Sequence, residues 1–161
     1  VLPEQMAVWA YPTDPDDEEA VIYNMVNALL VRIHLSGKLA GLNAACFELV
    51  KEAIGYYKNK RHLIRESLPF YPLGLYGVCD NNCWMALGMM EKKESRIAIW
   101  RRNASDSKCF VPFEFMEQIE SIECVYPTDR KYRPTLKLAK NGFEIELNSP
   151  LSGRIISLKH K

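Results

Sequence analysis

The stretch DPDDEEAVIYNMVNALLVRIHLSG, Asp14 to Gly37, begins with a run of acids and continues with scarcely a polar face. It predicts one long helix, with Asp14 as the N-cap, Pro15 at the first helical position and a stop at Gly37 after Ser36. Apolar residues lie on nearly every side of such a helix. A helix of this kind belongs in the interior of a larger body, so the question is what surrounds it.

A second helix is predicted from Asn43 to about Asn59. Charged residues on one side and an apolar stripe on the other are typical of a helix that lies on a surface. The stripe consists of Phe47, Val50, Ile54 and Tyr57. One amphipathic helix of this length cannot cover the first helix on all sides.

The N-terminal segment PEQMAVWAYP, Pro3 to Pro12, has an apolar centre that predicts a short buried strand, Gln5 to Trp9. A strand followed by a buried helix is one βα unit, and parallel sheets are built by repeating such units. A single unit cannot form a sheet. We therefore expect further βα units, outside these residues, to surround the helix, which makes the chain a piece of something longer.

The composition of the sequence changes near Pro72 to Gly77, after which short runs of alternating apolar and polar residues begin. The Asn141-Gly142 pair is typical of a two-residue hairpin turn. Short strands at this spacing favour an antiparallel sandwich or an open barrel. The predicted strands are Cys83–Met90, Arg96–Arg101, Cys109–Phe113, Ser121–Tyr126, Thr135–Ala139, Phe143–Leu147 and Arg154–Leu158.

Charge and composition narrow the class of partner. The 161 residues carry 21 Lys plus Arg against 20 Asp plus Glu, which indicates no nucleic-acid partner. No apolar run approaches the about 18 residues that span a bilayer, which indicates no membrane partner. An odd number of scattered cysteines indicates reduced thiols and a cytoplasmic location. The cysteines are Cys46, Cys79, Cys83, Cys109 and Cys124.

The side chains that could carry chemistry have structural explanations. The acids from Asp14 to Glu19 fit helix capping and the helix dipole better than a catalytic carboxylate pair. The pair Cys79 and Cys83 has a spacing found in zinc sites, but no second ligand pair follows, so CDNNC favours a turn. His34 is interpreted as a structural residue near a helix end. The motif classes for phosphate loops, serine hydrolases and zinc proteases are absent, so we expect no cofactor and no metal.

Several segments resemble bacterial α-galactosidases of glycoside hydrolase family 36. The most specific are NMVNALLVRIHLSG, Asn24 to Gly37, and PFYPLGL, Pro69 to Leu75. The tail IELNSPLSGRIISLK, Ile145 to Lys159, is similar to the closing strands of their C-terminal β domain. The resemblance covers most of the chain and is weakest from Glu91 to Lys137.

The resemblance implies an α+β piece: residues 1–74 the last βα unit or units of a (β/α)₈ barrel with two main helices, residues 75–161 an antiparallel β-sandwich domain. It also implies a parent that hydrolyses terminal α-galactosides of the raffinose or melibiose type with retention, through two aspartates about 5 Å apart. The family's motifs for both aspartates lie upstream, so no catalytic residue is expected in this chain, which should be inactive alone. An α-galactoside substrate is the expected partner of the parent, and a homo-oligomer is compatible with the resemblance.

Barrel geometry adds candidate substrate-binding residues. The carboxyl end of the Gln5–Trp9 strand would point to the active face, which places Trp9 and Tyr11 near the sugar pocket. A role for Trp9 in capping the barrel core fits equally well. The same geometry predicts that His34, at the end of the long helix, lies on the opposite face. An alternative from another class is a stand-alone β-sandwich that binds sugar or protein, with a helical arm covered by a partner.

Overall fold

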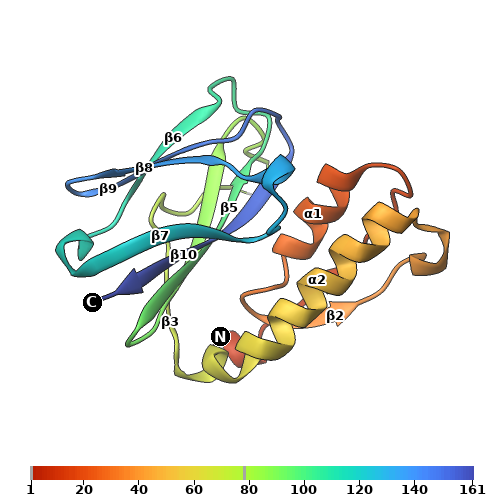
Figure 1. Cartoon of the computed structure of the whole chain (residues 1–161), viewed down its shortest axis with the longest axis horizontal. Coiled ribbons are helices and arrows are strands. Elements are labelled where there is room, and N and C mark those ends of the chain that lie inside the picture. Colours follow the sequence, from red (N-terminus) through yellow and green to blue (C-terminus); the bar gives the residue numbers. More distant parts are fainter. Residues whose placement is uncertain (1, 78) are drawn as a thin grey trace.

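The computed structural model describes residues 2–77 and 79–161, and Figure 1 shows their arrangement. The described residues form two α-helices, α1 (Glu18–Val26) and α2 (Ala44–Lys60), and short 3₁₀ segments. They also form the strands β1 (Ala7–Ala10), β2 (Arg32–Leu35), β3 (Leu68–Phe70), β4 (Trp84–Met90), β5 (Glu94–Arg101), β6 (Lys108–Pro112), β7 (Ile119–Tyr126), β8 (Thr135–Ala139), β9 (Gly142–Glu146) and β10 (Ser152–His160).

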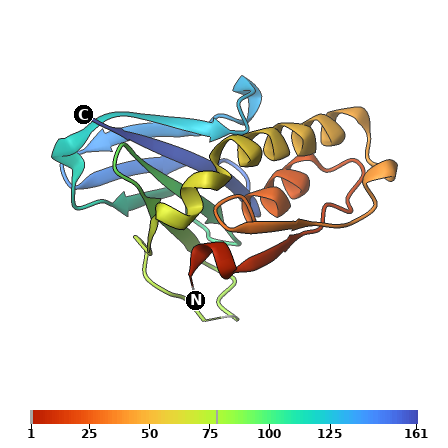
Figure 2. The same cartoon turned by 90° about the horizontal axis from the view of Figure 1, so that it is seen from below.

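The elements stack in layers. A five-stranded antiparallel sheet, in the order β3-β4-β5-β10-β7, faces a three-stranded antiparallel sheet, β6-β9-β8. The two helices lie against the other face of the five-stranded sheet, and the parallel pair β1–β2 lies beyond the helices (Figure 2). The chain is therefore an α+β structure, with helices and a parallel pair attached to an antiparallel β-sandwich.

The β-sandwich confirms the strands predicted after residue 75 to within two residues at every end. Thr135–Ala139 is reproduced as β8, and the turn at Asn141-Gly142 joins it to β9 in an antiparallel pair. Side chains from both sheets fill the space between them, as alternation along each strand requires. The inter-sheet core includes Ile97, Ile99, Val111, Phe143, Ile145, Ile156 and Leu158.

The prediction of one long helix from Asp14 to Ser36 is wrong. The helix α1 ends at Val26, a turn follows, and residues 32–35 form strand β2, which runs parallel to β1. The physical reason is that the stretch from Val21 to Val31 is largely apolar and mostly buried, so its periodicity does not show where the helix ends. The chain therefore contains two βα units, β1–α1 and β2–α2, where the long helix allowed one.

The helix starts differ in how well they were predicted. The N-cap of α1 is Asp17, whose side chain accepts a hydrogen bond from the backbone N–H of Ala20 at 2.9 Å, so Asp14 is not the cap. The helix α2 starts next to Asn43, where its start was predicted, and Asn43 is its N-cap, which accepts from the N–H of Cys46 at 2.8 Å. The buried face of α2 is rotated from the predicted stripe, because Phe47 is exposed. That face consists of Cys46, Leu49, Val50 and Ala53.

The apolar helix is covered by this chain itself. One continuous core joins α1 to α2, to the inner sides of β1 and β2, and to the outer face of the five-stranded sheet through Met89, Ala98 and Ile155. Burial of this apolar core holds the two regions together. It stabilises the fold by about 25 cal/mol for each Å² of apolar surface removed from water. The expectation that other βα units enclose the helix on this side is therefore wrong, because the sandwich occupies that position.

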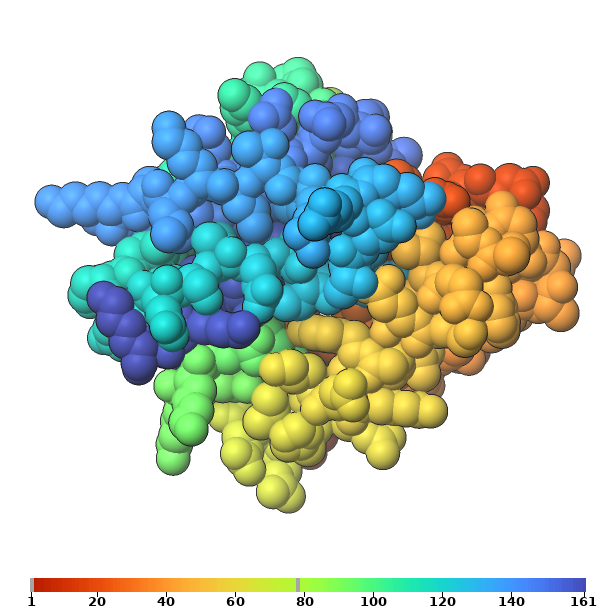
Figure 3. All heavy atoms as spheres, in the orientation of Figure 1, coloured from red at the N-terminus to blue at the C-terminus, as the bar shows by residue number. Residues whose placement is uncertain are grey.

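The segment between the two regions contains a strand that the sequence did not predict. Strand β3 pairs with β4, so that Phe70 lies opposite Gly88. A Cβ added at Gly88 would overlap the Phe70 ring, which explains the glycine. The domain boundary at residue 74 stays a prediction. Figure 3 shows the helical residues, orange to yellow, pressed against the green to blue residues of the sandwich.

Candidate functional site

The candidate site is the uncovered face of the β1–β2 pair. Val8, Ala10 and Ile33 pack toward the helices, whereas Trp9 and His34 are exposed on the other side. Alternation along each strand produces this division, because successive side chains point to opposite faces of a sheet. Within the described residues, no other element covers the second face (Figure 2).

Parallel pairing fixes which residues share an edge. Trp9 is the register partner of His34, and the N–H of Ser36 donates to the carbonyl of Ala10 at 2.9 Å. The carboxyl ends of both strands therefore meet at one edge. In barrels and open α/β sheets that edge is where ligands bind. The prediction that His34 lies on the opposite face from Trp9 is wrong, because His34 belongs to a strand and not to the end of a helix.

The turn after β2 approaches the turn after β1. Gly37 has φ 112°, and a Cβ added there would lie 2.8 Å from the carbonyl oxygen of Pro12. Only glycine fits both the backbone conformation and the space. Gly37 therefore holds the two loops of the carboxyl edge close together, instead of ending a helix.

The two predicted substrate-binding residues lie at this edge. Trp9 is 64% exposed and Tyr11 is 48% exposed. The backbone N–H of Tyr11 donates to Asn24 Oδ1 of α1 at 3.2 Å, which fixes the start of the loop. Exposed aromatic rings at an edge of this kind are suitable platforms for the C–H faces of a sugar. Their role in sugar binding stays a prediction.

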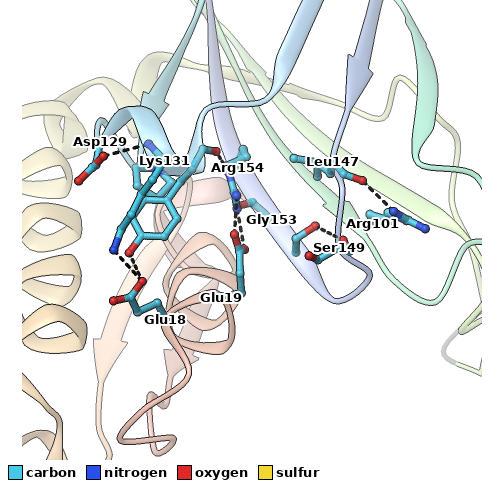
Figure 4. Close-up of polar contacts among 12 residues, drawn as sticks. Glu18, Glu19, Arg101, Asp129, Lys131, Leu147, Ser149, Gly153 and Arg154 are labelled. Atoms are coloured by element: carbon cyan, nitrogen blue, oxygen red, sulfur yellow. Dashed lines mark hydrogen bonds and ion pairs between the residues drawn. The ribbon is translucent and has the colours of Figure 1, made fainter.

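The acids near this edge are engaged in structure. Glu18 pairs with Lys131 at 2.8 Å, and this hydrogen bond holds the pKa of the Glu18 carboxyl below its usual 4.5. Glu19 pairs with Arg154 at 2.6 Å. A general acid needs a raised pKa, so the lowered value argues against that role for Glu18. These carboxylates join α1 to the β-sandwich, as Figure 4 shows.

The cysteines also lack the features of a reactive site. All five lie in the described part of the chain, and none forms a disulfide there. Burial raises the pKa of Cys109 and of Cys124 to about 11, so both thiols stay protonated and weakly nucleophilic at neutral pH. Residues 2–77 and 79–161 hold no cluster of three His, Cys, Asp or Glu side chains that could bind a metal. No helix among these residues is long and apolar enough to cross a membrane.

The sequence around His34 contains a pattern typical of a strand, which is overlooked when the stretch is interpreted as a helix. In VRIHL, Val31, Ile33 and Leu35 alternate with Arg32 and His34, which is the period of a strand. The signal is only five residues long and follows directly on an apolar helix. Its length explains why the strand, and with it the position of His34, was missed.

No family model matches the chain, and no curated protein sequence matches it. Its fold does match solved structures. A variant of the family 36 α-galactosidase of Geobacillus stearothermophilus in complex with 1-deoxygalactonojirimycin superimposes with a TM-score of 0.60 at 13% identity, over 86% of this chain and 19% of that one. An α-amylase of Anoxybacillus gives 0.55 at 16% identity, over 88% and 32%. An α-amylase of Geobacillus thermoleovorans complexed with acarbose gives 0.52 at 13% identity, over 90% and 34%.

These matches concern the fold. The chain spans about a fifth of the length of the α-galactosidase and about a third of the length of each α-amylase. At identities this low, the superpositions show a shared architecture only, and a fold alone does not determine an activity. The chain therefore has a glycosidase-related fold, which matches the C-terminal β-sandwich region of family 36 structures at a distance.

Proposed function

We propose that this chain is the C-terminal portion of a retaining α-galactosidase that hydrolyses terminal α-galactosides of the raffinose or melibiose type. The observation that carries the proposal is the parallel register of β1 and β2, with Trp9 beside His34 at the carboxyl edge of an uncovered face. Two βα units followed by an antiparallel sandwich fit the end of a (β/α)₈ barrel enzyme. The likeness to family 36 structures supports the choice of substrate.

In this proposal the uncovered face of β1–β2 faces the barrel interior of the parent. The nucleophile and the general acid/base are aspartates on earlier strands, about 5 Å apart, so that a covalent glycosyl-enzyme forms and is hydrolysed. The contribution of this chain is to bind the sugar. The Trp9 ring offers an apolar platform, and the His34 imidazole offers a hydrogen bond to a hydroxyl group.

The test compares the isolated chain with the protein extended upstream of Val1. We expect the extended protein to hydrolyse 4-nitrophenyl α-galactoside faster than the α-glucoside, and the isolated chain to hydrolyse neither, because it lacks both aspartates. Turnover by the purified isolated chain would overturn the proposal, as would an extended protein that prefers the glucoside.

A pair of variants of the extended protein tests the site. Trp9→Ala should raise KM for the aryl galactoside by about tenfold, since stacking on an aromatic ring is lost. Phe110→Ala is the control, because Phe110 is an exposed aromatic residue on β6, in the three-stranded sheet of the sandwich. Equal kinetics for the two variants would exclude Trp9 from the sugar site.

The second candidate function is a stand-alone sugar-binding or interaction module. The observation that favours it is that α1 is buried between α2, the β1–β2 pair and the sandwich, all within this chain, so the helical arm does not require a partner to cover it. Binding of galactose by a stable, monomeric isolated chain, with no activity in any extended form, would favour this candidate. Isothermal titration calorimetry and size-exclusion chromatography measure both properties.

A further inference from the structure

A groove runs along the junction between α1 and the turn that joins β9 to β10. One wall is formed by Glu19, Tyr23 and Asn24, and the opposite wall by Ser149, Pro150 and Leu151. The hollow has a volume of about 540 Å³. A second hollow of about 170 Å³ shares Glu19 and Ser149 with the first and continues past Asn148. We call the two together the junction groove.

The floor of the groove is rigid. The Arg154 side chain is buried and donates to both carboxylate oxygens of Glu19, at 2.6 and 2.9 Å, and to the carbonyl of Tyr132 at 2.6 Å. Figure 4 shows the Glu19–Arg154 pair crossing from α1 to the sandwich, with Ser149 nearby. A bidentate pair of this kind fixes the geometry of the groups around it. The groove is therefore formed before any ligand arrives.

The walls combine apolar surface with polar groups that have no partner in the described residues. Tyr23, Pro150 and Leu151 supply the apolar surface. The Nδ2 of Asn24 and the hydroxyl of Ser149 make no side-chain hydrogen bond there as donors, although Asn24 Oδ1 is engaged by Tyr11. Apolar surface with a few free amide and hydroxyl groups is the composition that receives a sugar ring, whose faces are apolar and whose rim carries hydroxyls.

Leu151 is held in an unusual conformation. Its φ is 52°, in the left-handed region that non-glycine residues rarely adopt, and 53% of the residue is exposed. A branched apolar side chain gains nothing from solvent in that position. Such conformations are retained at ligand-binding sites more often than elsewhere.

We propose that the junction groove is a second carbohydrate-binding site, which takes a pyranose unit of an oligosaccharide. It rests on the proposed function only for the class of ligand. A free anion is disfavoured, because the carboxylate of Glu19 lies between the two hollows and the charge of Arg154 is already neutralised by it. The bond from Tyr11 to Asn24 connects one wall of the groove with the loop that follows β1.

The experiment is an NMR titration of the ¹⁵N-labelled 161-residue chain with raffinose, and in parallel with maltotriose. We expect the Asn24 side-chain amide and the backbone amides of Ser149 and Leu151 to shift with a dissociation constant of about 1 to 10 mM for at least one sugar. Shifts confined to Trp9 and His34 would overturn the proposal, as would the absence of shifts at sugar concentrations up to about 50 mM.

Variants separate the groove from the carboxyl edge. Leu151→Gly suits the left-handed backbone and removes the apolar rim, so we expect a stable protein whose groove affinity falls about fivefold. Tyr23→Ala should weaken binding about tenfold. Tyr71→Ala, at an exposed tyrosine of another surface, should leave it unchanged. Unchanged binding in both groove variants contradicts the proposal.

The failure of this proposal can be distinguished from the failure of the proposed function. Trp9→Ala should leave the groove shifts intact, since Trp9 does not line the groove. Groove binding together with an inactive extended protein would remove the α-galactosidase proposal and keep this one. An active extended protein whose groove binds no sugar would do the reverse.

Discussion

The sandwich and the parallel pair β1–β2 differ in what each leaves uncovered. The five-stranded sheet is covered on both faces, by the three-stranded sheet on one side and by the helices on the other. The β1–β2 pair is covered by the helices on one face alone, and its other face exposes Trp9 and His34. One region thus finishes its core within this chain, while the other presents a parallel sheet surface that proteins ordinarily bury on both sides.

The largest expected effects come from the two cores that meet at the shared sheet. Ile22→Ala, between the helices and the sheet, and Ile145→Ala, between the two sheets, should each lower the free energy of unfolding by about 3 kcal/mol. Because both cores use the five-stranded sheet, urea denaturation should show one transition by both far-ultraviolet circular dichroism and tryptophan fluorescence.

A separate early loss of helical signal in Ile22→Ala, with the sandwich transition unchanged, would show that the two regions unfold independently. Leu138→Ala is the control, because Leu138 is an exposed residue on β8. It should change the unfolding free energy by no more than about 0.5 kcal/mol.

The next effect comes from the ion pair across the junction. Arg154→Ala leaves the Glu19 carboxylate without its partner and removes a donor from the carbonyl of Tyr132, so we expect a loss of about 2 kcal/mol. Glu19→Gln keeps an acceptor for the guanidinium and should cost less. Chemical denaturation of the two variants makes the comparison. A larger loss in Glu19→Gln would contradict the assignment of Arg154 as the buried member.

A smaller effect tests where α1 begins. Asp17→Ala removes the side chain that accepts from Ala20 and should cost about 1 kcal/mol of stability. Asp14→Ala is the matched control and should stay within about 0.5 kcal/mol of the parent. A larger loss of stability in Asp14→Ala than in Asp17→Ala, measured by thermal or urea unfolding, would support a helix that begins at Asp14, as the sequence predicted.

The smallest effect is a dependence on pH from carboxylates that join the two regions. Burial raises the pKa of Glu94, but hydrogen bonds from Lys60 and Ser157 outweigh it, so the pKa is lowered below 4.5. A depressed folded-state pKa contributes stability above 4.5, and that contribution is lost as the pH falls through the folded-state value. We therefore expect stability to decline below about pH 4.5, and less steeply in Lys60→Met. Equal slopes for both proteins in urea denaturation from pH 3 to 6 would contradict the pairing.

The sequence predicted the sandwich well and the parallel region poorly. Strands β6 to β9 keep exposed positions and alternate apolar and polar residues, which makes them recognisable as strands. Strands β4, β5 and β10 are buried on both faces, but turn residues mark their ends. Leu29 to Val31 is buried and directly precedes β2, whose alternation lasts only four residues, so the apolar content of the stretch resembles a helix. Strand β3 was missed because Pro69 lies within a three-residue run.

The candidate site was predictable in part. Trp9 stands at the end of an apolar segment before a helix start, and strand geometry alone places it at the carboxyl edge. His34 could be placed there only after β2 was known to be a strand, because its position depends on parallel pairing with β1. The junction groove depends on how residues far apart in the sequence, such as Tyr23 and Leu151, come together, and no local pattern encodes that.

The most direct test of the central claim is to read the coding sequence upstream of the Val1 codon. We expect an open frame that continues for several more βα units, with two aspartates at strand ends able to serve as nucleophile and general acid/base. Such a frame would complete the uncovered face of β1–β2. An initiation codon directly before Val1 would contradict the claim, and the chain would then be a protein that leaves Trp9 and His34 exposed for another purpose.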